Sequence, residues 1–143
     1  MGQPGAVPHL RYAGASPAVT RVLAVVLGLH GVAHLAGTSD AFTNAADGRS
    51  VEYLAGAWTV SDPTLLRAVG VVWALVGAGF VLAAAITWMR RPKWPGVLAA
   101  TSTLSLVAVV IALWSSVVGV VIDIALLAVA IRAGGLSRAK AGQ

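Results

Sequence analysis

The sequence predicts an all-α fold, a four-span antiparallel transmembrane helix bundle with both termini in the cytoplasm. Over 143 residues the apolar fraction is 58%, only 10% of residues are charged, and the mean hydropathy is +0.85. An ordinary soluble domain carries about 25% charged residues, so most of this protein's exterior must face lipid. The apolar runs approach the roughly 20 residues that a bilayer crossing needs, and short basic segments separate them.

The N-terminal segment, residues 1–18, contains three prolines and several glycines without periodicity. We interpret it as a flexible cytoplasmic tail, and no cleavable signal peptide is evident in it. The first span follows over about 19–37 and opens a transmembrane domain that we place at 19–133.

An outer loop is expected at 38–64, and it holds four of the five acids, Asp40, Asp47, Glu52 and Asp62. After the turn at Asp47-Gly48, apolar residues at helical spacing predict a short amphipathic helix lying on the membrane surface: Val51, Leu54, Ala55 and Trp58. Asp62-Pro63 then predicts a helix N-cap followed by proline at the first helical position.

The second span is predicted at about 65–89, before the basic loop Arg90-Arg91-Pro92-Lys93. The apolar run from Pro95 to Ile131 would form a helix about 55 Å long, against a hydrocarbon core of about 30 Å. It must therefore fold back, and we place a tight hairpin at 114–119. This gives spans at about 95–114 and 117–131, followed by a basic cytoplasmic tail at 134–143.

The basic residues set the orientation of this arrangement. With four spans, Arg49 and Arg67 fall on the outer side, and the other eight share the opposite side: Arg11, Arg21, Arg90, Arg91, Lys93, Arg132, Arg138 and Lys140. The positive-inside rule then places both termini in the cytoplasm. The net charge of +5 reflects this topology, and we expect no nucleic-acid partner.

Two histidines and one aspartate lie inside the predicted spans. His30 is nine residues from Arg21, and Asp123 is nine residues from Arg132. At the helical rise, both lie about 13–14 Å above the cytoplasmic boundary, near mid-bilayer. Spans one and four are neighbours in the predicted bundle, so His30 and Asp123 can touch.

These residues define a predicted intramembrane polar cluster of five members: His30, His34, Ser102, Ser105 and Asp123. Trp73 lies inside span two, where it can line the same interior as His34. Three residues of the outer loop are candidates to complete a site above His34: Asp40, Glu52 and Trp58.

His30 and His34 at i, i+4 share one helix face, the spacing by which a helix presents two imidazoles to one metal. Together with Asp123 they could hold zinc, copper or non-haem iron, or relay protons to a redox partner. The pattern lacks the glutamate of HExxH, and the chain has no cysteine to supply a thiolate. The structural alternative is a buried His–Asp hydrogen bond that locks two spans together.

The stretch Leu29-His30-Gly31-Val32-Ala33-His34-Leu35, the second-span opening Leu66-Arg67-Ala68-Val69-Gly70 and the later helical hairpin resemble the small four-helix membrane proteins of the DoxX-like group. The Ala/Val/Gly/Arg bias is also similar to that of uncharacterised small membrane proteins of GC-rich, actinobacterial-type bacteria. The resemblance implies a place in the bacterial cytoplasmic (inner) membrane and roles beside respiratory or thiol-redox membrane complexes.

Three functions follow as hypotheses. The first is a non-enzymatic accessory subunit that packs against itself as a homo-oligomer, or against a larger membrane complex, within the lipid bilayer. The second is a membrane redox or proton-transfer protein that uses His30, His34 and Asp123. The third is a small dimeric transporter built around the same residues. By default we expect no cofactor; the alternatives are a metal, a haem or a quinone.

Overall fold

The computed structural model describes residues 16–53, 56–111 and 117–141 of the chain. Within these ranges it contains four helices and one two-stranded antiparallel hairpin. Their bounds are α1 Pro17–Ala46, β1 Val51–Tyr53, β2 Trp58–Val60, α2 Pro63–Trp88, α3 Trp94–Ile111 and α4 Val117–Ala141. The predicted all-helical character is therefore correct except for the hairpin.

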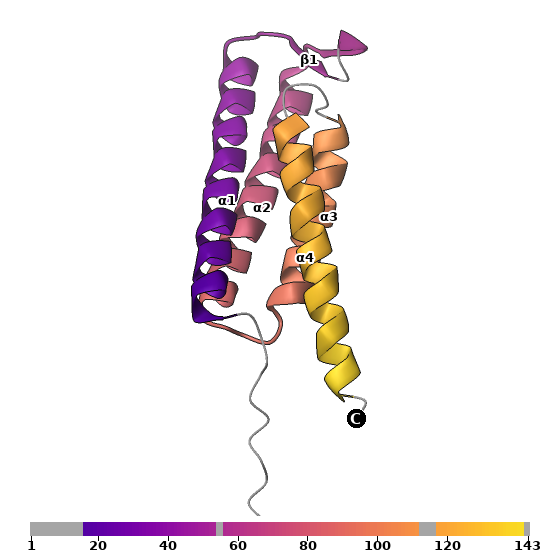
Figure 1. Cartoon of the computed structure of the whole chain (residues 1–143). Coiled ribbons are helices and arrows are strands. Elements are labelled where there is room, and N and C mark those ends of the chain that lie inside the picture. Colours follow the sequence, from indigo (N-terminus) through magenta and orange to yellow (C-terminus); the bar gives the residue numbers. More distant parts are fainter. Residues whose placement is uncertain (1–15, 54–55, 112–116, 142–143) are drawn as a thin grey trace, which may run out of the picture.

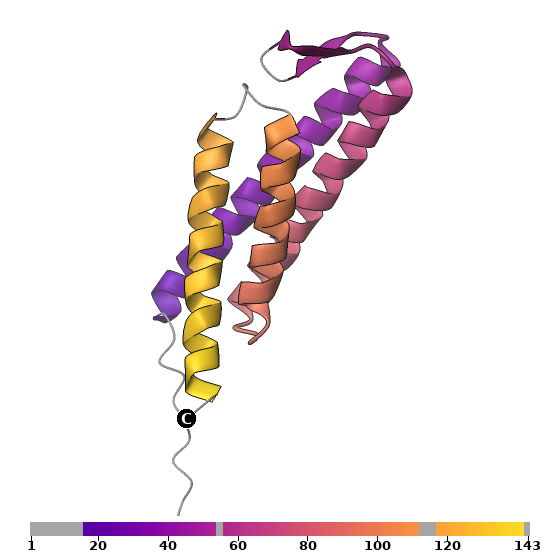
Figure 2. The same ribbon diagram turned by 90° about the vertical axis from the view of Figure 1, so that its right-hand side faces the viewer.

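The helices lie alongside one another as two pairs (Figure 1). α1 packs closely on α2, and α3 packs closely on α4, while α2 and α3 join the two pairs. The hairpin connects the upper ends of α1 and α2, and the turn at 89–93 connects the lower ends of α2 and α3. Seen from the side, the α1–α2 pair is tilted relative to the α3–α4 pair (Figure 2).

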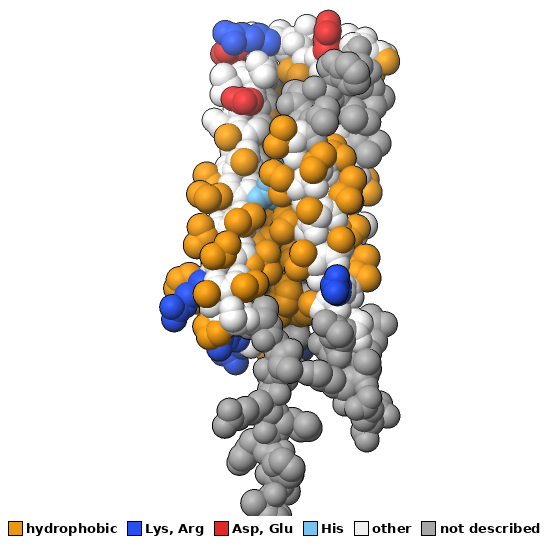
Figure 3. Space-filling view, viewed as in Figure 1, with side chains coloured by type: hydrophobic (Ala, Val, Ile, Leu, Met, Phe, Trp, Pro, Cys, Tyr) orange, Lys and Arg blue, Asp and Glu red, His pale blue; other side chains and the backbone are white. Residues whose placement is uncertain are grey.

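Three of the described helices are long and apolar enough to cross a membrane: Pro17–Ala46, Pro63–Trp88 and Val118–Gly135. A shorter apolar helix spans Trp94–Val109. An apolar band covers the middle of the molecule, with most of the visible basic side chains below it and the visible acidic ones above it (Figure 3). This distribution is typical of a membrane protein.

Helix α1 is longer than the predicted first span of 19–37. It begins after an N-cap in which the Ser16 hydroxyl accepts a hydrogen bond from the Val19 N–H at 3.3 Å, and Pro17 occupies the first turn. It then continues to Ala46, so residues 38–46 of the predicted outer loop are helical. Thirty residues make a rod of about 45 Å, which exceeds the roughly 30 Å hydrocarbon thickness.

The predicted amphipathic surface helix after Gly48 is wrong, because this segment forms the β1–β2 hairpin. Val51 pairs with Val60 and Tyr53 pairs with Trp58, and β-branched and aromatic side chains at these positions favour strands. Gly56, in the connection, has a φ of +85°, which a helix does not allow. Two further positions of the predicted helix, Leu54 and Ala55, lie outside the described residues.

Buried side chains attach the hairpin to the helix ends. Tyr53 and Val60 are 7% and 2% exposed and pack with Ala45 of α1 and Leu66 of α2. The hairpin therefore forms a small cap with its own apolar cluster, next to the helices it connects.

The predicted N-cap at Asp62 is confirmed. Its Oδ1 accepts hydrogen bonds from the backbone N–H groups of Thr64 and Leu65 at 2.6 and 3.1 Å, and Pro63 opens α2. The N–H groups of Leu65 and Thr64 lower the pKa of Asp62 below its ordinary value of 3.8, because they stabilise the ionised carboxylate.

Helix α2 ends in a tight turn with two closing hydrogen bonds. The Arg90 N–H donates to the Thr87 carbonyl oxygen at 3.0 Å, and the Arg91 N–H donates to that of Ile86 at 2.9 Å. This is a Schellman motif, in which the residue after the cap takes the left-handed conformation. Here that residue is Arg90, with φ +54°, instead of glycine.

The last apolar run forms two helices, α3 and α4, as the length argument requires. Residues 114–116 of the predicted hairpin at 114–119 lie outside the described residues, and residues 117–119 belong to α4. Helix α4 continues to Ala141, well beyond the predicted span end at 131. Most of the expected basic tail at 134–143 is therefore helical.

Helices α1 and α2 come into close contact at Gly31 and Gly77. A Cβ atom on either glycine would lie 2.9 Å from the carbonyl oxygen of the other, so the two backbones touch directly. An apolar core is drawn from all four helices: Leu27, Val76, Phe80, Ala83, Leu98, Ala108, Leu126 and Ala130.

Replacing Gly31 by alanine is expected to destabilise the protein, because the Gly77 carbonyl oxygen belongs to the backbone and cannot rotate away. Overpacking of this kind costs about 1–3 kcal/mol. Gly28 is the matched control on the same helix, since a Cβ there meets only Ala84 at 3.9 Å, an ordinary contact. Denaturant unfolding in detergent micelles measures both variants, and equal stabilities would contradict the close contact.

Replacing Asp62 by alanine should lower the melting temperature at neutral pH, because two N–H groups lose their acceptor. The pKa of Asp62 is lowered in the folded state, so its stabilisation is complete above 3.8 and is lost as pH falls through the lowered pKa. The gap between wild type and variant should therefore narrow in acid. Asp62→Asn, which keeps an acceptor oxygen, should lower the melting temperature less and without this pH dependence. A melting-temperature difference between wild type and Asp62→Ala that widens in acid would contradict the cap.

Candidate metal centre

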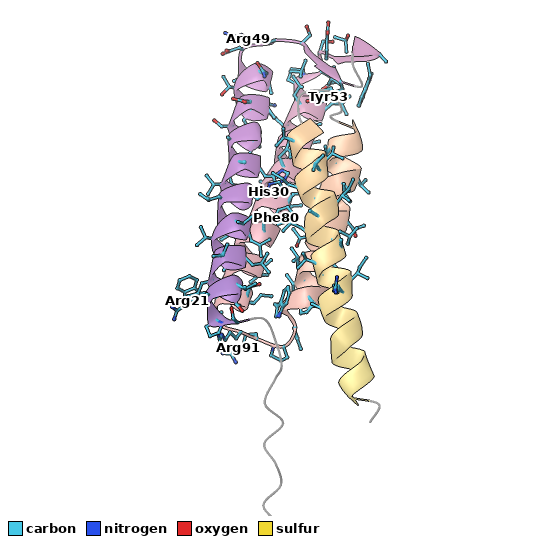
Figure 4. All side chains as sticks on the ribbon, in the orientation of Figure 1. Arg21, His30, Arg49, Tyr53, Phe80 and Arg91 are labelled. Carbon is cyan, nitrogen blue, oxygen red and sulfur yellow. The ribbon has the colours of Figure 1, made fainter. Side chains whose placement is uncertain are left out.

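Four polar side chains from three helices meet in the interior. α1 contributes His30 and His34, one turn apart on the same face, α3 contributes Ser105, and α4 contributes Asp123. All four are buried, with Asp123 and Ser105 fully so. His30 and Phe80 lie near mid-height between the two helix pairs (Figure 4).

The four side chains form a closed ring of contacts. His30 Nε2 lies 2.8 Å from Asp123 Oδ1 and 3.3 Å from His34 Nε2. His34 Nε2 lies 3.1 Å from Ser105 Oγ, which donates a hydrogen bond of 2.5 Å to Asp123 Oδ2. The predicted contact between His30 and Asp123 is therefore present.

The ring has too few hydrogens for all four contacts when Asp123 is ionised and both imidazoles are neutral. Each Nε2 has a single in-plane site, which either donates or accepts. If both nitrogens carry hydrogens, the two N–H groups face each other across 3.3 Å; if His34 Nε2 is bare, its contact with Ser105 has no hydrogen, because that hydroxyl donates to Asp123. With neutral imidazoles, at least one of the four contacts is therefore not a hydrogen bond. Two bare Nε2 atoms at 3.3 Å could instead both bind one metal ion.

Two aromatic rings of α2 fix the imidazoles. Trp73 and Phe80 both stack on His34, with centroid distances of 5.0 and 5.5 Å. Seven residues of helix separate Trp73 from Phe80, a rise of about 10.5 Å, which matches a ring held between them. Phe80 also meets the His30 ring edge-on at 4.6 Å. The histidine rotamers are therefore set by packing as well as by hydrogen bonds.

Both histidines are slightly accessible to solvent, with exposed fractions of 9% for His30 and 7% for His34. A patch of histidine is visible between α1 and α4 in the space-filling view, inside the apolar band and away from both charged ends (Figure 3). The site is therefore nearly closed, with its residual opening on the α1–α4 face.

Ser102, the fifth member of the predicted cluster, does not join the ring. It is fully buried one turn before Ser105 on α3, but its hydroxyl makes no hydrogen bond to any described residue. Ser102 and Ser105 are three residues apart, and only Ser105 reaches both His34 and Asp123.

The three outer-loop candidates lie away from the ring. Asp40 is exposed on the upper part of α1, and Glu52 is exposed in β1. Trp58 of β2 is 41% exposed and packs against Tyr53 at a centroid distance of 5.7 Å. The structure therefore does not bring them together with the ring residues: α1 continues as a helix past Asp40, and the hairpin packs on the helix ends.

Phe80 is the site residue that sequence reasoning missed. The signal was its spacing: Trp73, Gly77 and Phe80 recur at intervals of four and three, which places them on one face of α2. The prediction that Trp73 lines the interior beside His34 is confirmed, because the two rings stack.

His30, His34 and Asp123 have donor atoms that all lie within 4.8 Å of one another. Around a tetrahedral zinc ion with bonds of about 2.0–2.1 Å, neighbouring ligand atoms are about 3.3 Å apart. The observed separation of the two Nε2 atoms is 3.3 Å. Ser105 holds the second carboxylate oxygen, the role of an outer partner that orients a metal ligand.

Comparison with protein-family models, with curated proteins and with solved structures gives no match to this chain. The fold and the cluster therefore define only the class, a helical protein with membrane-compatible helices and a buried His/His/Asp/Ser ring.

Replacing Asp123 by alanine is expected to cost about 3–5 kcal/mol, because it leaves buried partners uncompensated. A double-mutant cycle of Ser105→Ala with Asp123→Asn should give a coupling energy of about 0.5–3 kcal/mol, since the two side chains are in direct contact. Unfolding in detergent measures each variant. Thr103, an exposed residue of the same helix, is the matched control: Thr103→Ala should not couple to Asp123→Asn, and a coupling of the same size there would contradict a specific bond.

Proposed function

We propose that the chain is a small integral membrane protein that holds one divalent transition-metal ion at His30, His34 and Asp123. The observation that carries this proposal is the convergence of two imidazole nitrogens, 3.3 Å apart, and a carboxylate oxygen, with all three donor atoms within 4.8 Å of one another in the interior. This is the metal-centred form of the second sequence hypothesis, a membrane redox or proton-transfer protein.

The donor set favours a borderline divalent ion. Imidazole suits zinc, iron, nickel and copper, and two histidines with one carboxylate is the ligand set of non-haem iron(II) sites with open positions. Soft sulfur ligands, which select copper(I), are not among the ring residues. We therefore infer zinc(II) or iron(II), with three protein ligands and an open position.

We infer that the protein crosses the bacterial cytoplasmic membrane four times as an antiparallel bundle, with both termini cytoplasmic. Five basic residues at the lower end support this orientation: Arg21, Arg90, Arg91, Lys93 and Arg132. Arg21 and Arg91 are labelled at that end, and Arg49 at the other (Figure 4). In this topology the metal lies near mid-bilayer. We also propose that the protein is related to the DoxX-like group, on the basis of the stretch that contains His30 and His34.

A second candidate is an accessory subunit that packs against itself or a larger membrane complex. The observation in its favour is that only 28%, 28% and 17% of the residues in the three spanning windows are buried within the chain. Much apolar helix surface is thus left for lipid or partner helices. Under this function alone, the His30→Gln/His34→Gln double variant still assembles with its partner and leaves the activity of the complex unchanged.

The purified full-length protein, stripped with chelator in mild detergent, should take up about one Zn²⁺ per chain. His30→Gln, His34→Gln and Asp123→Asn should each weaken binding about 100-fold or more, because each removes one of three ligands; Ser105→Ala should weaken it about 10- to 100-fold, as loss of an outer partner does. Equilibrium dialysis with elemental analysis measures the stoichiometry, and the visible spectrum of the Co²⁺ form reports the ligand geometry.

His9→Gln serves as the common background, so that this third histidine of the chain cannot contribute. Asp40→Asn is the matched carboxylate control on α1, because Asp40 is exposed and outside the ring, and it should bind as wild type does. Wild-type protein that takes up no more Zn²⁺ than the His30→Gln/His34→Gln double variant would overturn the proposal.

A further inference from the structure

A groove of about 400 Å³ lies beside the turn that joins α2 to α3. Its walls are apolar side chains of both helices, and its end at the turn carries two cations; the lining residues are Leu82, Ile86, Arg91, Pro92, Lys93 and Val97. An apolar trough closed by positive charge is complementary to an amphiphile with an anionic head and a hydrocarbon tail.

The cations are presented by a fixed backbone. The Arg91 N–H is held by the Ile86 carbonyl oxygen at 2.9 Å in the Schellman turn, and Pro92 follows directly. Helix α3 begins at Trp94, immediately after Lys93, so the positive end of its dipole adds to the two side-chain charges.

The groove lies where a lipid would need it. Arg91 is at the lower end of the molecule, at the edge of the apolar band (Figures 3 and 4). Ile86 and Leu82 lie two and six residues before the end of α2 at Trp88, at the depth of the part of an acyl chain next to the head group. Basic pockets between spanning helices on the cytoplasmic side are suited to anionic lipid head groups.

A second groove on the same molecule provides an internal comparison. It has about 360 Å³ and runs along α1, lined by Ala18, Val19, Val22, Leu23 and Val26. Its lining has no charged side chain, so it offers hydrocarbon contact without a preference for head-group charge. Of these two grooves, the one beside the α2–α3 turn is the one that combines apolar walls with basic side chains.

We propose that this groove binds one anionic phospholipid, with its phosphate between Arg91 and Lys93 and an acyl chain along Leu82, Ile86 and Val97. The proposal is independent of the metal centre, which lies on other residues in the interior. It requires only that α2 and α3 are in the membrane with the turn at the head-group level.

The test is native mass spectrometry of the full chain in detergent, with equimolar phosphatidylglycerol and phosphatidylcholine of identical acyl chains. One basic residue near a membrane surface contributes about 1 kcal/mol, or about fivefold. Wild type should therefore retain phosphatidylglycerol up to about 25-fold more than phosphatidylcholine. Arg91→Gln/Lys93→Gln should bring this ratio close to one.

The matched control is Arg132→Gln, an exposed basic residue of α4 outside the groove lining. It should keep the wild-type ratio; a ratio that falls equally in this variant would mean non-specific attraction and overturn the proposal. An unchanged ratio in Arg91→Gln/Lys93→Gln would also overturn it.

The apolar half is tested by Val97→Phe and, independently, by Leu82→Phe at a position that is 55% exposed and therefore tolerant of a larger side chain. Both should reduce retention of the two lipids alike, because they narrow the acyl groove. Retention that neither substitution changes would show that only the surface charge is involved, and the groove would not be a lipid site.

Discussion

The carboxylate of Asp123 is the constraint on which the arrangement of the helices depends. A charge at the centre of a spanning helix costs about 2.5–3.5 kcal/mol on insertion scales, and it must find partners inside the protein. Asp123 is fully buried and finds them on two other helices, His30 on α1 and Ser105 on α3. The helices pack mainly as an α1–α2 pair and an α3–α4 pair, which are tilted relative to each other (Figure 2). The contact between Asp123 and His30 joins α4 of one pair to α1 of the other.

Long apolar runs and isolated polar residues within them were the features that the sequence could predict. The depth of His30 and Asp123 follows from helical rise and the positions of Arg21 and Arg132, and the two side chains do meet. The choice between Ser102 and Ser105 depends on helix rotation, which small and apolar neighbours on all sides of α3 do not specify. Only a three-dimensional packing of α3 against α1 and α4 makes Ser105 the partner.

The errors at the upper end have a common cause. Two patterns overlap in this segment: Val51, Leu54, Ala55 and Trp58 fall at helical spacing, whereas Val51, Tyr53, Trp58 and Val60 alternate along two strands. The left-handed backbone conformations at Gly48 and Gly56 distinguish the two, and composition alone does not report them. The helix ends at 46 and 141 were underestimated because the span length was set by bilayer thickness. A helix need not stop where the hydrocarbon stops when its polar continuation still has good helix formers.

The contact between Gly31 and Gly77 has an evolutionary consequence. Each glycine faces a backbone carbonyl of the other helix, so neither position can gain a side chain while the other compensates by becoming smaller. Neither a single substitution nor a pair of substitutions at these two positions can replace glycine without moving α1 away from α2. His30 directly precedes Gly31 on α1, so such a movement would also displace His30. Homologous proteins that keep the ring of four polar side chains should therefore keep both glycines. Homologues that have lost both glycines should also have lost the ring.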